Sequence, residues 1–215
     1  MSVRLDGNDL AITGSTLGGV LDLARQEAET QRRVITDVVM DGQALTGDAL
    51  DRSADADITG HDIELTTADP AALVSGSLLD AADALEASRP QLDELATSFQ
   101  TGKHATALPK LAEVLGVWQV AQDVLTHGFA LLGQDPESIP GLYSDKHASQ
   151  HTGTGLGPLV DQLTAQLAEI RRSVEDQDFS AIADTLVYDL GPLAEPWSDA
   201  LRRAAQLAAG QAGSG

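Results

Sequence analysis

The first residues of the chain alternate between apolar and polar positions. Ser2 to Asp6 shows this period of two, a cluster of turn-forming residues follows at Gly7-Asn8-Asp9, and the alternation resumes from Leu10 to Thr13. A period of two is typical of a half-buried strand, and two such segments around a short polar turn favour a β-hairpin. The pattern therefore predicts that the chain begins with two paired strands.

A helix and two further strands are predicted after the hairpin. Apolar residues recur at helical spacing from Leu17 to Thr30, and Ser15 or Thr16 can cap the start of that helix. The segment from Arg33 to Met40 is rich in β-branched residues and stops at Asp41-Gly42, while Asp62 to Thr67 alternates cleanly. The predicted order is strand, strand, helix, strand, a short irregular segment, and strand.

This order of elements over residues 1–68 resembles the β-grasp fold of ubiquitin and the sulfur-carrier proteins. The resemblance implies a small α+β domain with one helix packed on a mixed sheet. Sulfur carriers react through a carboxy-terminal Gly-Gly, whereas here Thr67-Ala68-Asp69 continues into a predicted helix, and the last residues are Ala212-Gly-Ser-Gly215. We therefore expect this domain to serve as a rigid binding surface rather than in conjugation chemistry.

From Asp69 onward the apolar period changes from two to about 3.6, which marks an expected domain boundary. Asp69-Pro70 is a strong helix start, because it pairs an N-cap residue with a proline in the first turn. Four amphipathic helices are predicted, with a kink or break near Arg89-Pro90 in the first and a bend at Gly191-Pro192 in the last. They begin near residues 70, 105, 159 and 178. The fold class is thus α+β: a β-grasp-like domain, then a four-helix-bundle-like domain over 69–209, and a disordered tail over 210–215.

One long connection interrupts the helical pattern. Residues 133–158 are rich in Gly, Pro, Ser and His and contain no periodic apolar stripe. Loops of this length in compact domains are usually functional or disordered, so we expect a flexible loop between the second and third helices.

Charge and composition exclude several classes of function. Thirty-three acidic residues against 13 basic ones give a formal net charge of −20, which repels nucleic acids and anionic membrane surfaces. The absence of cysteine excludes disulfide scaffolds, thiolate metal sites and cysteine nucleophiles. No secretory signal or membrane span is apparent, which favours a cytoplasmic protein without a cofactor. The acidic surface is equally consistent with adaptation to high salt.

The best candidate for a metal site lies within the long loop. His147 and His151 have the i, i+4 spacing that places two imidazoles on one helical face, and Asp145 is close by. A zinc protease needs a glutamate beside the first histidine, but that position is Ala148. The alternative is a pair of solvent-exposed loop histidines, and we assign no metal ligands on this pattern alone.

Three aromatic residues are the candidates for binding a protein partner. Tyr188 and Trp197 belong to the predicted last helix, and Trp118 belongs to the second. Tyrosine and tryptophan are enriched at the energetic centres of protein interfaces. The competing interpretation is that these rings form the core of the bundle, where large aromatic residues at helical spacing are also typical.

These patterns favour a non-enzymatic adaptor that binds a protein partner through a bundle groove or through the edge of the sheet. The sequence leaves two alternatives open. The first is a secretion or flagellar-type export chaperone, a class that this chain resembles in its acidic, helical composition. The second is a metal-dependent enzyme that uses His147 and His151. A second copy of the chain is a further candidate partner.

Overall fold

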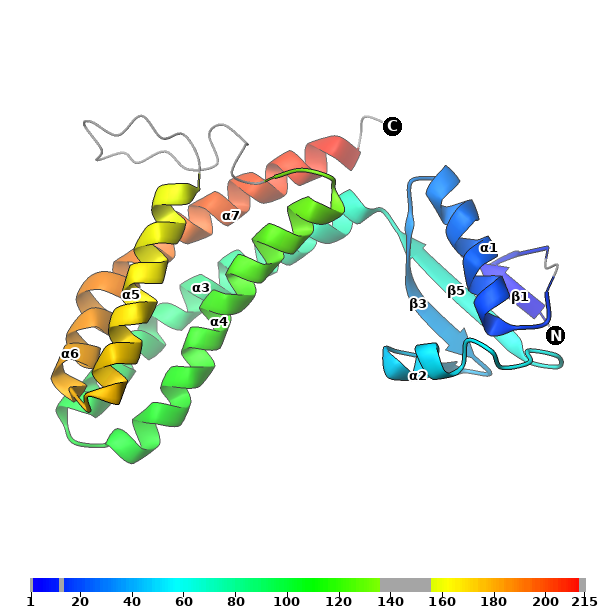
Figure 1. The fold of residues 1–215 in the computed structure, drawn as a ribbon. Coiled ribbons are helices and arrows are strands. Elements are labelled where there is room, and N and C mark those ends of the chain that lie inside the picture. Colours follow the sequence, from blue (N-terminus) through cyan, green and yellow to red (C-terminus); the bar gives the residue numbers. More distant parts are fainter. Residues whose placement is uncertain (1, 12–13, 136–155, 213–215) are drawn as a thin grey trace. The chain divides into compact units, whose positions relative to one another are not determined.

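A computed structural model describes residues 2–11, 14–135 and 156–212. The chain divides into two compact units, Met1–Leu73 and Val74–Gly215. The first holds a five-stranded sheet with two helices, and the second is helical (Figure 1). The α+β class predicted from the sequence is therefore confirmed.

The sheet has the spatial order β2-β1-β5-β3-β4. Its strands are β1 (Ser2–Leu5), β2 (Asn8–Asp9), β3 (Val34–Met40), β4 (Gln43–Ala44) and β5 (Asp62–Ala68). Strand β1 runs parallel to β5, with Val3 beside Ile63 and Leu5 beside Leu65, and the other pairs are antiparallel. Parallel pairing brings together strands that are far apart in the sequence, which lets α1 cross between them.

Both hairpins of the sheet turn on an Asp-Gly pair. Asp6 and Gly7 have φ angles of 50° and 78°, and Asp41 and Gly42 have φ angles of 50° and 80°. Two-residue loops of this left-handed conformation match the twist of antiparallel strands. The predicted first hairpin is confirmed, but its second strand is Asn8–Asp9 rather than the expected Leu10–Thr13, because the chain turns one residue earlier than predicted.

Helix α1 (Leu17–Thr30) has the predicted bounds, and the side chain of Thr16 accepts a hydrogen bond from the Gly19 amide at 3.3 Å. The short helix α2 (Asp48–Arg52) lies in the segment that we expected to be irregular. The core of this unit is apolar and joins one face of the sheet to α1; its buried members are Val3, Leu5, Leu17, Val20, Leu21, Ala24, Val38, Ile58, Ile63 and Leu65.

The second unit consists of long helices that reverse direction at each connection (Figure 1). They are α3 (Pro70–Gln100), α4 (His104–Leu131), α5 (Gly157–Glu175) and a last segment made of α6 (Phe179–Asp184), η2 (Thr185–Leu190) and α7 (Gly191–Ala212). Leucine and alanine dominate the shared core, with Phe99, Trp118, Phe129 and Trp197 as its large aromatic members.

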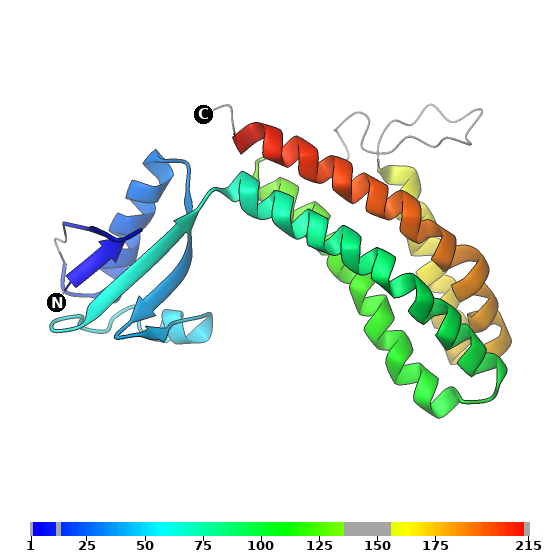
Figure 2. The same ribbon diagram turned by 180° about the vertical axis from the view of Figure 1, so that it is seen from behind.

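Of the kink or break expected near Arg89-Pro90, the structure rules out the break. The helix continues through Pro90 to Gln100, and Figure 2 shows it as one uninterrupted ribbon. Pro90 lies on the exposed side of the helix. A carbonyl that loses its helical partner there can be hydrated by solvent, which lowers the cost of the proline.

The expected bend at Gly191-Pro192 takes the form of a π-helical turn. Residues Thr185–Leu190 form η2, and the Gly191 amide donates to the Leu186 carbonyl five residues earlier. Pro192 has no amide hydrogen, so it cannot donate to the carbonyl four residues earlier, which lies within η2. The extra residue in this turn shifts the face that the following helix presents.

Candidate functional site

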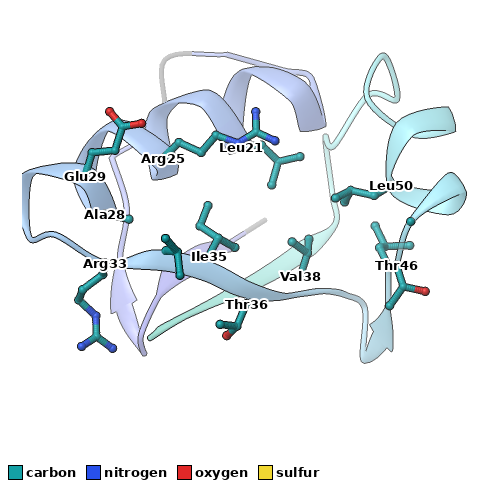
Figure 3. A pocket seen from close by; sticks show the side chains of 13 residues that line it. Leu21, Arg25, Ala28, Glu29, Arg33, Ile35, Thr36, Val38, Thr46 and Leu50 are labelled. Carbon is teal, nitrogen blue, oxygen red and sulfur yellow. The ribbon is translucent and has the colours of Figure 1, made fainter. Parts of the chain in front are cut away.

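The strongest candidate site lies beside β3, where a bulge changes the direction of the side chains. Ile35 pairs with Thr67 and Asp37 pairs with Thr66, so that Thr36 is the extra residue on β3. The bulge leaves Thr36 and Asp37 exposed in succession, whereas Val38 is buried. Figure 3 shows Ile35 and Val38 on the side of β3 that faces α1, while Thr36 points away.

The outer edge of β3 is open along half of its length. Strand β4 pairs only with Val39 and Met40, and one further hydrogen bond of 2.8 Å runs from the Leu45 amide to the Val38 carbonyl. The sheet ends at β4, so within the described part of the chain residues 34–37 are paired with a strand on the β5 side only. A backbone edge of this kind can accept an added strand.

An open groove of about 500 Å³ runs beside this edge, between α1, β3 and the segment that contains α2. Its apolar surface comes from residues of the unit's core: Leu21, Ala28 and Val38 are buried, and Ile35, Leu45 and Leu50 are partly exposed. Figure 3 shows Leu21 and Leu50 directed toward the space above Ile35 and Val38. Partly exposed core residues of this kind can bury more surface if a partner covers them.

The balance of acidic and basic side chains in the groove lining differs from that of the whole unit. Residues 1–73 carry fourteen acidic and five basic side chains, but the groove lining contains two arginines and one glutamate, Glu29. Arg25 lies over the groove and contacts Asp22 at 3.1 Å. The groove lining is therefore close to neutral in net charge within a strongly acidic unit.

The second arginine, Arg33, holds the strands together and points away from the groove (Figure 3). Its guanidinium donates to the Thr67 side chain at 2.6 Å and to the Thr67 carbonyl at 2.7 Å. The Thr67 amide and hydroxyl in turn donate to the carboxylate of Asp6. These bonds lower the pKa of Asp6, and the nearby charge of Arg33 acts in the same direction. The network ties β1, β5 and β3 together at the end where the open edge begins.

The structure divides the three aromatic candidates into two groups. Trp118 and Trp197 are fully buried, and their rings meet edge to face with centroids 6.5 Å apart. The prediction that these two residues bind a partner requires correction, because their rings fill the space between helices and are closed to a partner in this state. Tyr188, on η2, is 73% exposed and is the accessible member of the three.

The metal candidates Asp145, His147 and His151 lie outside the described residues. Among the residues that the structure describes, there is no group of three or more histidines, aspartates or glutamates that could hold a metal ion. In the same part of the chain, no helix combines the length and the apolar character needed to cross a lipid bilayer.

Sequence reasoning missed the groove, although one signal for it was present. Asp41-Gly42 between apolar positions is a hairpin signal, and it leads to the short β4 that leaves half of β3 uncovered. Comparison of the chain with protein-family models, curated proteins and solved structures finds no match. The case for function therefore depends on the geometry of the site.

Proposed function

We propose that this chain is a non-enzymatic adaptor that binds an extended segment of a protein partner along the open edge of β3. The observation that carries the proposal is the coincidence of an unpaired strand edge, residues 34–37, with an apolar groove on the α1 side. The backbone of an added strand would pair with β3, and its side chains would fill the groove.

The proposal includes a more specific architecture. Residues 1–68 form a β-grasp domain, and residues 69–209 form a four-helix-bundle domain in which α6, η2 and α7 together count as one helix. The strand order β2-β1-β5-β3-β4, with α1 crossing between the first hairpin and β3, supports the first assignment. The three successive reversals between the four helical segments support the second.

The groove and its surroundings favour a particular chemistry in the partner. Side chains of a bound strand alternate between its two faces, so every second residue would enter the groove and should be apolar. Outside the groove the unit is acidic, which attracts basic residues on either side of the bound segment. We therefore expect a partner segment with alternating apolar residues and lysine or arginine at its ends, whose association slows as salt is added.

A library of random twelve-residue peptides displayed on phage tests the proposal with the full chain as bait. The expected result is enrichment of alternating apolar peptides with basic ends. In ¹⁵N NMR spectra, a synthetic peptide from this selection should shift the amide signals of residues 34–37 and slow their exchange with solvent. The absence of enrichment, or shifts confined to the helical unit around Tyr188, would contradict the proposal.

Leu45 and Leu10 provide a matched pair of control variants. Each is partly exposed, packs on the core of the same unit, and donates its amide at 2.8 Å to an inner strand, Leu45 to Val38 and Leu10 to Val3. Only Leu45 lines the groove. Leu45→Asp should abolish peptide binding, whereas Leu10→Asp should preserve it at a similar cost in stability. Equal loss in both variants would show that folding, rather than the groove, controls binding.

A further inference from the structure

Helix α4 has a second apolar face besides the one it buries. Its buried residues recur at helical spacing from Ala107 to Phe129 and include Trp118. Val117, Val120, Val124 and Leu131 fall at i, i+3, i+7 and i+14, which places them together on a different side of the helix. Val120 is 56% exposed and Leu131 is 54% exposed, while Val117 and Val124 are half-buried. We call this surface the outer α4 face.

The outer α4 face is also almost free of charge. The nineteen residues from Val114 to Leu132 contain one carboxylate, Asp123, and no lysine or arginine, although 21% of the whole chain is charged. The single histidine of this stretch, His127, directs Nδ1 toward the Asp123 carbonyl oxygen at 3.0 Å. A surface helix that needs to bury only one face normally carries charged residues on its other sides.

Leu79, an exposed apolar residue on α3 of the same unit, has a different setting. Leu79 on α3 is 43% exposed, but Asp80 is its neighbour and Asp83 lies one turn further on. Asp83 is part of an ion pair with Arg202 of α7, 2.9 Å away. Leu79 is thus a single apolar residue on a charged surface, which is common in proteins and calls for no partner.

We infer that the outer α4 face is the interface through which two copies of this chain form a symmetric dimer. Each copy has a formal net charge of −20, so most surfaces of one copy repel those of the other. A two-fold interface brings the same patch of both copies together, and a patch with a single sign of charge cannot complement itself. The apolar and nearly uncharged outer α4 face can do so, with the two helices packed side by side and antiparallel.

The structure offers room for such close packing at the start of the face. Gly116 precedes Val120 by one turn, and a Cβ atom built on Gly116 meets no atom within 4 Å. A glycine one turn from the exposed Val120 lets the backbones of two helices approach closely. Dimerisation would also place two β3 edges in one particle, which raises the avidity for a partner with repeated segments. The dimer does not depend on the proposed peptide binding, and either can fail without the other.

Sedimentation velocity of the full chain, measured over a range of concentrations, tests this inference. The wild-type protein should sediment as a dimer of twice 22.4 kDa. Val120→Glu should weaken the dimer by about a hundredfold, because symmetry places two buried valines in the interface and each contributes about 1.5 kcal/mol. The matched control is Leu79→Glu, the same kind of change on α3, which should leave the dimer intact.

Salt dependence supplies a second readout. Added sodium chloride screens the repulsion between two acidic copies, so the dimer should become tighter as salt is raised. An interface built on ion pairs would weaken instead. The inference is overturned if the wild-type chain stays monomeric, if Val120→Glu remains dimeric, or if Val120→Glu and Leu79→Glu dissociate the dimer to the same extent. Far-UV circular dichroism of both variants verifies that their helices are retained.

Discussion

Replacement of Gly191 by alanine tests the π-helical turn in the last helical segment. Alanine in a helix interior is normally about 1 kcal/mol more stabilising than glycine. Gly191 has helical dihedral angles, φ −55° and ψ −48°, so alanine meets no backbone strain there. However, a Cβ atom at this position would lie 3.1 Å from the Leu186 carbonyl oxygen, the atom that accepts the Gly191 amide.

The magnitude follows from these two opposing effects. The close contact forces the Leu186 carbonyl to move and weakens a hydrogen bond whose net contribution is about 1 kcal/mol. Gly191→Ala should therefore be about neutral, since the loss offsets the helix-propensity gain. Gly76 provides the reference: it is exposed on α3, and a Cβ atom there meets nothing within 4 Å. Gly76→Ala should stabilise the protein by about 1 kcal/mol.

Tryptophan fluorescence during urea unfolding is the appropriate assay. Trp118 and Trp197, the two tryptophans of the chain, are buried in the helical unit, so their emission reports on that unit alone. The two variants should differ by about 1 kcal/mol in the free energy of unfolding. If Gly191→Ala gains as much stability as Gly76→Ala, the contact with Leu186 imposes no constraint and the reasoning is refuted.

Three further predictions concern individual side chains. Asp6→Asn should destabilise the sheet unit at neutral pH, as measured by thermal unfolding at a series of pH values. Because folding lowers the pKa of Asp6, the stability difference between wild type and variant should persist above about pH 4 and vanish as the pH falls through the lowered pKa. Arg32→Gly and Gln177→Gly should each stabilise the chain by about 1 kcal/mol in urea unfolding, because both residues follow a helix with left-handed φ angles of 54° and 56°; a loss of stability would contradict this. Trp197→Ala should lower the free energy of unfolding by about 3 to 5 kcal/mol. Trp197→Phe should lower it clearly less, because the buried indole N–H has no hydrogen-bond partner among the described residues. An equal loss of stability in both variants would show that the indole N–H does have a hydrogen-bond partner.

Local signals in the sequence were sufficient for most of the helices. The cap at Thr16 and the apolar spacing after it gave the bounds of α1, and Asp178 caps α6 by accepting from the Ala181 amide, near the predicted start of the last helix. These signals work because capping and amphipathic spacing involve residues within a few positions of one another. The break that was one of the two outcomes expected at Pro90 does not occur, because proline is tolerated inside a helix where solvent can hydrate the freed carbonyl.

The groove could not be predicted from local patterns because it depends on long-range register. A β-branched run from residue 33 to 40 identifies β3, but the bulge at Thr36 becomes apparent only when β3 is aligned with β5. The two-residue strand β4 is too short to show a period of two. The same limit applies to Trp118 and Trp197, because helical spacing alone does not distinguish a core ring from an interface ring.

The parallel pairing of β1 with β5 also determines when during synthesis the groove can form. Ser2 and Asp62 are partners in the register, and the Asp62 side chain accepts from the Ser2 amide at 2.8 Å although the two residues are sixty positions apart in the sequence. Closing a loop of that length costs about 4 kcal/mol in chain entropy before the contact stabilises anything. On the ribosome, β1, α1 and β3 must therefore wait as an open and incomplete sheet until β5 emerges. Because β5 pairs with β3 and leaves only its outer edge free, a chain able to bind along that edge has already completed the folding of this unit.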